Sequence, residues 1–470
     1  MWKQISIPPT DDGRYTATIN KIVTFALEHR HASICFSTTI YLDLRPSVKA
    51  DDFDVVAFAD DFLHCLSGKS PEDRRDITLS IFSALQEIVV RNPSDSAKKI
   101  TACTRLGIEF DRRHEASLPS FWLIDRVEKR DRSNGKPIWI DSQGRQFQFT
   151  NTTQSGKHDF GKGTYSSVRA AIMDGKTEIA VKKFNDFAGE PKPPEIDWAE
   201  ELGIAREFRL MQLLSEAHIC PTPYFLAYFA DSKGEHPIKM GMERCEDTLA
   251  DSFRFERMPF DEGKLFAARL RFDKWMGTNR ANLADFLLKL QKMHEKSLCH
   301  GDVKIFNALK SALNGTYYWG DFGGVSSLEQ LLINPARRRL QSNPAPETLP
   351  AVAKSYPKSK DPAGRRKELL GADIWAVGML FAMCVVDIEP RLNLFNFDPD
   401  KFGNESALQA TTAFRGFLER EIPVFLTELE RMTGPVFTDF IGRCLKIDPL
   451  ERPTVAELLE HPLMQFGTPL

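Results

Sequence analysis

The residues best suited to chemistry lie in one short stretch, CHGDVKIFNALKSALNGTYYWGDFGG, which is residues 299–324. Asp302 falls in a predicted loop, Asn307 at the start of a predicted strand, and Asp321 directly after a second strand. Asn314 precedes a glycine and is typical of a hairpin turn. The side chains of Asp302, Asn307 and Asp321 all carry oxygen atoms and can be directed at one point. What these three side chains would bind depends on the rest of the chain.

A glycine-bearing turn lies upstream, in the stretch DFGKGTYSSV, residues 159–168. Gly161 and Gly163 form a G-x-G-x-x-S-x-V pattern between two predicted strands, and Ser166 stands where the usual pattern has its third glycine. Glycine lets backbone N–H groups approach phosphate oxygens because no Cβ intervenes. A plain hairpin turn explains the same residues equally well, so this stretch alone does not define a nucleotide site.

The apolar strand IAVK ends in a lysine, Lys182. A lysine in such a strand needs an anionic partner to offset its burial. Phosphate on one side and a helix glutamate on the other would supply one. The candidate glutamate is Glu207, in the helical pattern REFRLMQLL, and the alternatives are Glu200 and Glu201.

The elements that must position these residues fall into two predicted domains, because 470 residues exceed what one ordinary core holds. Residues 1–130 are expected to be a mostly helical domain of unknown role, since helical periodicity recurs in TINKIVTFALEHR, FDVVAFADDFLHCL and RRDITLSIFSALQEIVV. The polar stretch VEKRDRSNGKP, residues 127–137, is interpreted as a linker. Residues 138–466 form the second predicted domain, in which strands and one helix precede a larger helical part.

Composition limits the classes of function. Hydrophobic residues make up 42% and charged residues 27%, and a net charge of −3 gives no overall attraction to nucleic acid, which is not expected as a partner. Eight cysteines occur singly, without a C-x-x-C pair, which indicates reduced thiols in a cytosol-like compartment. The start has no apolar core of a Sec-type signal peptide, and the apolar run 374–386 is too short to span a bilayer, so integral membrane association is not expected.

Taken together, the motifs resemble those of a eukaryotic-type protein kinase over about residues 140–466. GKGTYSSV, IAVK, HGDVKIFN, DFG and APE occur in the order of that family. DIWAVG and LKIDPLERPTVAELLEHP follow them and strengthen the match. The resemblance implies an α+β, bilobal fold, with a β-rich N-lobe at about 138–243 and a helical C-lobe at about 246–466. It also implies transfer of the γ-phosphate of ATP to serine or threonine hydroxyls of a protein substrate.

The resemblance gives four residues a catalytic role. Asp302 would accept or orient the proton of the attacking hydroxyl, and Lys304 would contact the γ-phosphate. A lysine at this position is typical of serine/threonine kinases rather than tyrosine kinases. Lys182 would contact the α- and β-phosphates while paired with Glu207. Phosphoryl transfer depends mainly on positioning and on neutralising charge, which these residue types can provide.

The resemblance also implies how the cofactors are bound. Asn307 and Asp321 would hold Mg²⁺, or Mn²⁺, against the nucleotide phosphates. Met242 occupies the gatekeeper position, and Glu243 to Cys245 would be the hinge that reads adenine. The nucleotide contacts implied in this way are Gly161, Gly163, Ser166, Val168, Ala180, Lys182, Met242, Glu243, Cys245 and Leu309. Other side chains would have structural roles: an internal column of Met211, His300 and Phe322, and an ion pair between Glu347 and Arg452.

One position departs from the family pattern, because Gly301 replaces the arginine of H-R-D. In kinases that carry it, this arginine binds a phosphorylated residue of the activation segment. We therefore expect activity that does not need phosphorylation of Ser326, Ser327 or Ser342. The HGD sequence also occurs in small-molecule kinases, which makes such an enzyme an alternative.

Further alternatives come from other classes of function. A pseudokinase that binds partners without catalysis would be expected to have lost one of the five residues Lys182, Glu207, Asp302, Asn307 and Asp321, and all are present. A kinase-fold enzyme that transfers AMP or glutamate is another alternative. Control is expected to come from intrinsic order of the activation segment, from contact with the N-terminal domain, or from a regulatory partner that binds through this domain. A divergent kinase joined to an unrecognised helical domain is also similar in architecture to pathogen effectors. The basic segments at 337–339 and 351–368 are interpreted as solvated loops. The alternative is a positive face beside the substrate groove that would favour acidic peptides, a phosphoinositide or a nucleic-acid surface.

Overall fold

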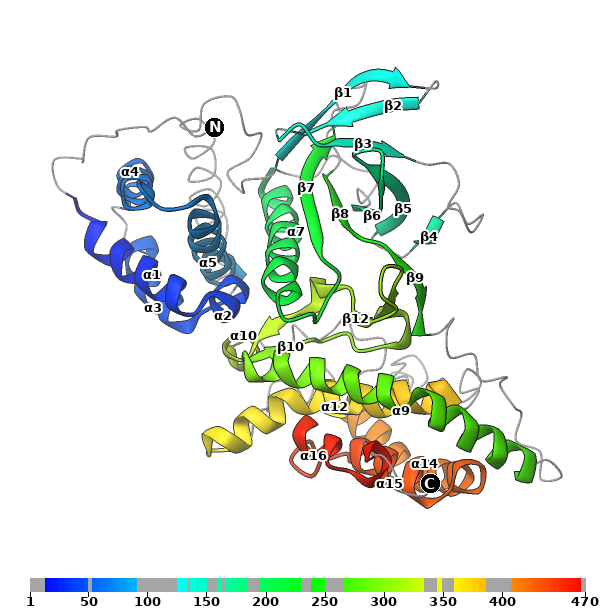
Figure 1. The fold of residues 1–470 in the computed structure, drawn as a ribbon. Helices are drawn as coiled ribbons and strands as arrows, with labels where there is room; N and C mark the ends of the chain where they lie inside the picture. The colour runs from blue at the N-terminus through cyan, green and yellow to red at the C-terminus, as the bar shows by residue number, and fades with distance from the viewer. Residues whose placement is uncertain are drawn as a thin grey trace. The chain divides into compact units, whose positions relative to one another are not determined.

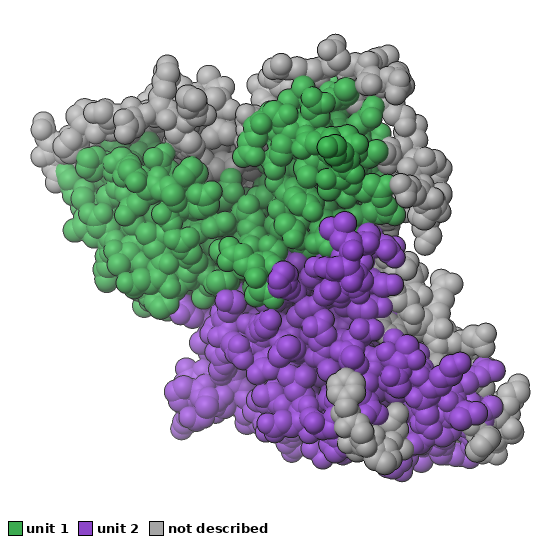
Figure 2. Space-filling model, in the orientation of Figure 1, with its two compact units in different colours: residues 1–217, 221–244 green, residues 218–220, 245–470 purple. Residues whose placement is uncertain are grey.

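The computed structural model describes residues 13–49, 53–90, 125–133, 136–141, 143–149, 159–162, 166–184, 194–229, 238–249, 265–333, 345–348, 359–385 and 407–465. The chain divides into two compact units (Figure 2). Unit 1 comprises residues 1–217 and 221–244, and unit 2 comprises residues 218–220 and 245–470. The division therefore falls within the predicted hinge, between Arg244 and Cys245. The predicted domain boundaries at 130 and 138 stay a prediction.

Unit 1 begins with a bundle of helices (Figure 1). Their amphipathic patterns explain the bundle: in the first helix the buried residues are Ile19, Ile22, Val23 and Ala26, which share one face. Asp54 caps a later helix by accepting hydrogen bonds from the N–H groups of Val56 and Ala57. The mostly helical character predicted for this region is confirmed by the helices described, which are α1 (Thr16–Glu28), α2 (Arg30–Cys35), α3 (Thr38–Lys49), α4 (Val55–Leu66) and α5 (Pro71–Val90).

An eight-stranded sheet forms the rest of unit 1 together with one helix. The strands are β1 (Asp125–Ser133), β2 (Lys136–Ile140), β3 (Gln146–Phe149), β4 (Asp159–Lys162), β5 (Ser166–Met173), β6 (Thr177–Phe184), β7 (Pro223–Phe229) and β8 (Ile238–Glu243). Their order is β3-β2-β1-β7-β8-β6-β5-β4, and an additional pairing of β3 with β5 curls the sheet onto itself. The curled sheet encloses an aromatic-rich core that includes Trp139, Phe147, Phe225 and Phe229.

The interpretation of residues 127–137 as a linker is wrong. This stretch lies in strands β1 and β2, which pair antiparallel with each other, while β1 also pairs in parallel with β7. Val127 is fully buried in the core of the sheet, opposite Phe229 in the register, while Lys129 is exposed. Charged residues dominate this strand, so its composition resembles that of a loop even though its apolar position anchors it in the sheet.

Helix α7 (Pro194–Ser215) is the remaining helix among the described residues of unit 1 and lies between the bundle and the sheet (Figure 1). It contacts strand β7 as well as helices α2 and α5. Its second half is buried on nearly every face, including three charged residues, Arg206, Glu207 and Arg209. A helix buried all round must find partners for such groups on more than one side.

Unit 2 is mainly helical. Its helices are α9 (Leu265–Glu295), α10 (Leu328–Ile333), α12 (Pro362–Val385), α14 (Ala407–Thr433), α15 (Pro435–Cys444) and α16 (Val455–Leu459). Its strands and 3₁₀ turns are β9 (Cys245–Thr248), β10 (Leu298–Cys299), η3 (Ile305–Asn307), β11 (Ala308–Ser311), β12 (Tyr317–Trp319), η4 (Phe322–Gly324), β13 (Ser326–Ser327), η6 (Pro346–Thr348) and η8 (Pro462–Met464). The strands form two small sheets, β12-β11-β9 and β10-β13, and β11 and β12 lie within the stretch 299–324.

Helix α12 contains a long apolar window. It is long and apolar enough to cross a membrane by length and composition, but 94% of its apolar window is buried inside the protein, as in the core helix of a folded domain. Its first turns come from the basic segment that was interpreted as a solvated loop, and this interpretation is wrong for residues 362–368. Arg366 in these turns donates hydrogen bonds to Ser297 Oγ, at 2.9 Å, and to the carbonyl oxygen of His294.

Candidate active site

The predicted pairing of Lys182 with Glu207 is present in unit 1. Lys182 Nζ lies 2.7 Å from Glu207 Oε1, and the two side chains are only 12% and 6% exposed. Strand β6 supplies the lysine and helix α7 the glutamate. Removing either partner of an ion pair with so little solvent around it is costly, because the other charge is then left buried without compensation. The position of α7 therefore decides whether Lys182 keeps its partner.

The strand register brings the predicted nucleotide contacts of unit 1 next to one another. In the pairing of β5 with β6, Val168 lies opposite Lys182. In the pairing of β6 with β8, Ala180 lies opposite Met242. Gly161 of β4 pairs with Val168, whereas Gly163 and the side chain of Ser166 lie outside the described residues. Directly opposed residues on neighbouring strands are close enough to form one surface.

The predicted hinge begins at the end of β8. The buried side chain of Glu243 accepts a hydrogen bond from the backbone N–H of Thr222 at 3.3 Å, and its own N–H donates to the Thr222 carbonyl at 2.8 Å. Glu243 is thus held to the start of β7. Cys245 opens strand β9 in unit 2, where it pairs with Ser311 of β11.

In unit 2, three of the predicted catalytic and metal-binding residues are bonded to one another. Lys304 Nζ lies 2.6 Å from Asp302 Oδ2. Asn307 Nδ2 donates to the same oxygen at 2.9 Å and to the backbone carbonyl of Asp302, also at 2.9 Å. A loop and the 3₁₀ turn η3 hold this arrangement. The carboxylate of Asp302 is therefore fixed in direction by an amide and a cation, as a group that must orient a proton requires.

Asp321 occupies a strained backbone conformation at the end of β12. Its φ is 59° and its ψ is 73°, in the left-handed region that non-glycine residues seldom adopt, and its side chain is exposed. Gly320 before it approaches Leu309 so closely that an added Cβ would lie 2.6 Å from Leu309 Cδ1. Leu309 itself lies in β11, opposite Tyr318 of β12.

The donor atoms present fit a divalent cation shared with phosphate. The hydrogen bonds of Asn307 use its amide nitrogen, so the amide oxygen is the atom suited to a cation, and Asp321 offers an exposed carboxylate. Among the described residues, no three His, Cys, Asp or Glu side chains gather as a metal cluster. A hard cation held by one carboxylate and one amide needs additional oxygens, and nucleotide phosphates supply them.

A buried aspartate of α12 fixes the backbone of the loop that carries Asp302. Asp373 accepts hydrogen bonds from the backbone N–H groups of His300, at 2.8 Å, and Gly301, at 2.9 Å. Its Oδ2 also lies 3.0 Å from His294 Nε2. Burial raises the pKa of Asp373, but the hydrogen bonds from His294 and Gly301 outweigh burial, and the pKa falls from 3.8 to about 2. The ionised carboxylate is therefore a permanent anchor for this loop.

His300 packs against the aromatic residues around the loop. Its ring centroid is 5.5 Å from that of Phe322 and 5.3 Å from that of Trp319. Burial lowers the pKa of His300 although neighbouring carboxylates raise it, so the imidazole is neutral at neutral pH. The predicted contact of His300 with Phe322 is therefore confirmed. Met211, the third residue of the predicted column, is buried in unit 1.

The conformation of Gly301 gives a physical reason for the departure from H-R-D. Its φ is +77°, and a Cβ added here would lie 2.7 Å from the backbone carbonyl oxygen of Gly324. A side chain at this position would therefore be strained and would push on the turn that follows Asp321.

The predicted ion pair of Glu347 with Arg452 is also present. Arg452 Nη1 and Nη2 lie 2.6 Å and 2.9 Å from the two carboxylate oxygens of Glu347, and both residues are buried. Arg452 donates further hydrogen bonds to the carbonyls of Lys446 and Gly371. One guanidinium thereby ties the A-P-E turn to α12 and to the loop that follows α15.

Comparison with known proteins identifies the family. The model of the protein kinase domain matches residues 155–464, which is more than half of the chain. The chain belongs to the protein kinase family. Its fold class is therefore the predicted one, a kinase fold with a curled sheet and a helical C-terminal part, preceded by a helical region.

Named relatives of this kinase are serine/threonine-protein kinases. Serine/threonine-protein kinase 4 homolog A of Dictyostelium discoideum is 24% identical over 312 residues, 65% of this chain and 54% of that protein. Serine/threonine-protein kinase TAO3 of Homo sapiens is 24% identical over 317 residues, 67% of this chain and 29% of that protein. Mitogen-activated protein kinase kinase kinase 1a of Physcomitrium patens is 25% identical over 328 residues, 66% of this chain and 34% of that protein.

The kinase chain spans about half the length of these relatives or less. Their names give no support to the interpretation as a pathogen effector.

Sequence reasoning missed three polar residues that hold the site in place. His294 bonds to Asp373, and Arg209 on helix α7 bonds to Asp76 of the N-terminal bundle. Asp76 is 133 positions from Arg209, and no local pattern links them. The available signal was a charged residue, Asp76, on the apolar face of a predicted helix, which requires a partner when it is buried.

Proposed function

We propose that this protein is an ATP-dependent serine/threonine protein kinase that uses Mg²⁺ or Mn²⁺. The observation that carries the proposal is the bonded set around Asp302, in which Lys304 and Asn307 share one carboxylate oxygen. Membership of the protein kinase family and the names of the relatives support it. The Lys182–Glu207 ion pair adds the second element that phosphoryl transfer requires in this family.

Each residue has a distinct task in the proposed reaction. Asp302 orients the substrate hydroxyl and holds its proton at a carboxylate oxygen, while Lys304 stabilises charge that develops on the transferred phosphoryl group. Lys182, kept in place by Glu207, binds the α- and β-phosphates. Asn307 and Asp321 would hold the divalent cation, which supplies charge neutralisation on the phosphates when bound.

The proposed enzyme does not require phosphorylation of its activation segment. Gly301 offers no side chain with which to bind a phosphate group. Ser326 and Ser327 lie in β13 and are buried, and Ser327 Oγ accepts a hydrogen bond from the backbone N–H of Gln330. Buried hydroxyls that already serve the fold are poor acceptors for another kinase. Ser342 lies outside the described residues.

A phosphotransfer assay with γ-labelled ATP and generic protein substrates tests the activity. The wild type is expected to label serine or threonine, and Asp302→Asn and Asp321→Ala are expected to lose on the order of 10²- to 10⁴-fold in rate. Glu419→Gln is a matched control, because this carboxylate is exposed and pairs with Arg415 of the same helix. No label from the wild type, or equal label from Asp302→Asn, would reject the proposal and favour a pseudokinase.

A separate assay tests the independence from phosphorylation. The triple variant Ser326→Ala, Ser327→Ala and Ser342→Ala is expected to keep activity within about threefold of the wild type, because no phosphate on these residues is needed. Its stability is expected to fall by about 1–3 kcal/mol, since the buried N–H of Gln330 loses its acceptor, Ser327 Oγ. Phosphatase treatment of the wild type is expected to have no effect. Loss of activity in both experiments, with circular dichroism unchanged, would contradict this part of the proposal.

A further inference from the structure

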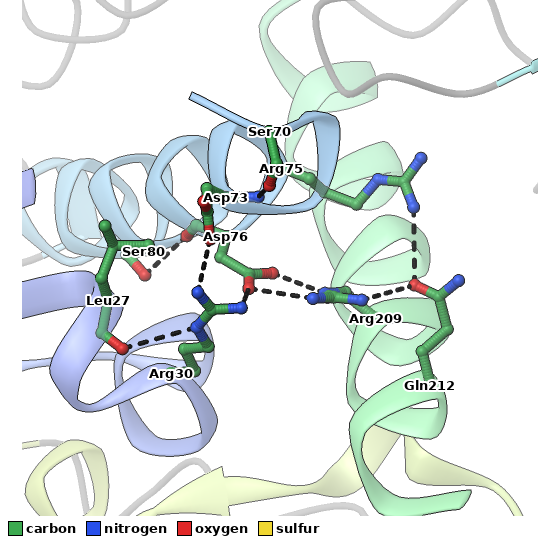
Figure 3. A network of polar contacts seen from close by, with 9 residues as sticks. All are labelled: Leu27, Arg30, Ser70, Asp73, Arg75, Asp76, Ser80, Arg209 and Gln212. Atoms are coloured by element: carbon green, nitrogen blue, oxygen red, sulfur yellow. Dashed lines mark hydrogen bonds and ion pairs between the residues drawn. The ribbon is translucent and has the colours of Figure 1, made fainter. Parts of the chain in front are cut away.

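The N-terminal bundle contacts helix α7 on the side away from Lys182. Arg209 Nε lies 2.5 Å from Asp76 Oδ1, and Arg209 Nη2 lies 3.0 Å from Asp76 Oδ2 (Figure 3). Asp76 belongs to α5 and has no exposed side-chain surface, and the Arg209 side chain is 8% exposed. A bidentate guanidinium–carboxylate pair fixes distance and orientation together. This contact therefore determines where α7 lies relative to the bundle.

Further polar contacts surround this ion pair. Arg30 of α2 lies 3.4 Å from Asp76 Oδ2 and also pairs with Asp73, so that two guanidinium groups share the buried carboxylate (Figure 3). Gln212 Oε1 accepts hydrogen bonds from Arg209, at 3.1 Å, and from Arg75 of α5, at 3.4 Å (Figure 3). Both helices of the bundle that contact α7 thus take part in one network.

The network and the Lys182–Glu207 pair lie on the same short piece of helix. Glu207 and Arg209 are two residues apart, which at 3.6 residues per turn places them on nearly opposite faces of α7. Glu207 bonds to β6 of the sheet, while Arg209 bonds to α5 of the bundle. A rotation or shift of α7 that breaks one pair also changes the other.

We propose that Asp76 is a positioning residue for the phosphotransfer reaction, because the N-terminal bundle holds α7 through Arg209 and so keeps Glu207 paired with Lys182. The inference rests on the proposed kinase function. It gives the N-terminal helices a task within the chain itself, since they keep α7 in its active position without an activating phosphate or a second protein. Asp76 acts only through Arg209 and Glu207, and it contacts neither nucleotide nor substrate.

The test measures the helix and the reaction separately in the full-length protein. Hydrogen exchange of the α7 amides in Asp76→Asn and Arg209→Gln is expected to be faster than in the wild type, with the exchange of β6 and β8 unchanged. In the phosphotransfer assay, both variants are expected to lose about 10- to 100-fold in kcat, because a small misplacement of a positioning group has an effect of this size. The KM for the protein substrate is expected to stay the same.

Matched variants separate positioning from general damage to the bundle. Asp54→Ala removes the N-cap of α4, which does not involve α7, and is expected to lower the melting temperature while leaving kcat unchanged. Arg209→Lys keeps the positive charge but cannot bond to both carboxylate oxygens as the planar guanidinium does. Its kcat is expected to lie between those of the wild type and Arg209→Gln. In a Glu207→Gln background, Asp76→Asn is expected to change kcat by less than about twofold, since the residue it acts through is already disabled.

The outcomes distinguish this inference from the proposed function. An inactive wild type would reject the kinase function, and exchange of the α7 amides would still show whether Asp76 holds the helix. An active wild type with equal kcat in Asp76→Asn would overturn the inference alone. Unchanged hydrogen exchange of the α7 amides in Asp76→Asn would also overturn the inference. So would a further 10- to 100-fold loss in kcat when Asp76→Asn is added to Glu207→Gln.

Discussion

At the scale of single residues, the loop that carries Asp302 depends on a backbone conformation that only glycine adopts without strain. Gly301 has a φ of +77°, and its Cα faces the carbonyl oxygen of Gly324. Gly301→Ala is expected to cost about 1–3 kcal/mol of unfolding free energy, from left-handed strain and from the clash with this carbonyl. Urea denaturation measures the change. Phosphotransfer is expected to fall as well, because the carbonyl belongs to the turn after Asp321.

Gly68 provides a control for this substitution. It has the same φ of +77°, but an added Cβ would meet nothing within 4 Å. Gly68→Ala is therefore expected to lower the free energy of unfolding only through left-handed backbone strain, by about 1 kcal/mol. If Gly301→Ala were no more destabilising than Gly68→Ala, the close approach to Gly324 would not constrain this position.

Asp373 gives a prediction of pH dependence. Its pKa in the folded protein is about 2, below the ordinary value of 3.8, so its contribution is fully present above about pH 4 and is lost as the pH falls toward 2. Asp373→Asn is expected to lower the free energy of unfolding by about 2 kcal/mol at pH 7. The difference from the wild type is expected to shrink below pH 4, as denaturant titrations at several pH values would show.

A second histidine–aspartate pair tests whether exclusion of solvent strengthens this contribution. Asp439 lies 3.0 Å from His461, the same distance as between His294 and Asp373, but its side chain is 52% exposed. Solvent screens such a pair, so Asp439→Asn is expected to have a much smaller effect. A pH-independent loss in Asp373→Asn would show instead that its role is packing.

At the scale of elements, the Glu347–Arg452 pair holds the 3₁₀ turn η6 to α12. Both side chains are buried, and the guanidinium also bonds to the Gly371 carbonyl of α12. Glu347→Ala is expected to cost about 3–5 kcal/mol of unfolding free energy, because it leaves Arg452 buried without its counter-ion. Calorimetry or urea denaturation would measure this loss.

The exposed pair Arg415–Glu419 on α14 is the comparison, with side chains 47% and 58% exposed. Glu419→Ala is expected to cost no more than about 0.5 kcal/mol. Arg452→Lys is not expected to behave conservatively, since a lysine cannot bond to both carboxylate oxygens and the carbonyls at once. A stability equal to the wild type in Glu347→Ala would show that the pair makes no net contribution.

The elements also show what the sequence could and could not predict. Helix α7 and its Glu207–Lys182 pair follow from local periodicity and from the need of a buried lysine for an anion. Strand β1 was not predicted, because its many charged residues outweigh the buried Val127 in composition. The Asp76–Arg209 pair joins positions far apart in the chain, and only the packing of α5 on α7 reveals it.

At the scale of the whole molecule, the kinase family accounts for only part of unit 1. The family match begins at residue 155, whereas the helices that contact α7 end at residue 90. The sheet continues outside the match as well, since β1 to β3 precede residue 155 and β3 closes the sheet onto β5. Segments that the family model does not contain thus support the two elements, β5–β6 and α7, that present the Lys182–Glu207 pair.

Nucleotide binding gives a prediction for the stability of the whole chain. A ligand that binds only the folded protein, present at 100 times its Kd, stabilises it by about 2.7 kcal/mol, so ATP with Mg²⁺ is expected to raise the melting temperature by several degrees. Removing the cation with EDTA, or changing Asp321→Ala, is expected to remove most of this rise, because the phosphates then lose the cation that joins them to the chain. Asp302→Asn is expected to keep the rise while losing phosphotransfer, since Asp302 is assigned to the proton rather than to the cation. Differential scanning fluorimetry measures all four conditions, and an equal rise with and without the cation would contradict the roles of Asn307 and Asp321.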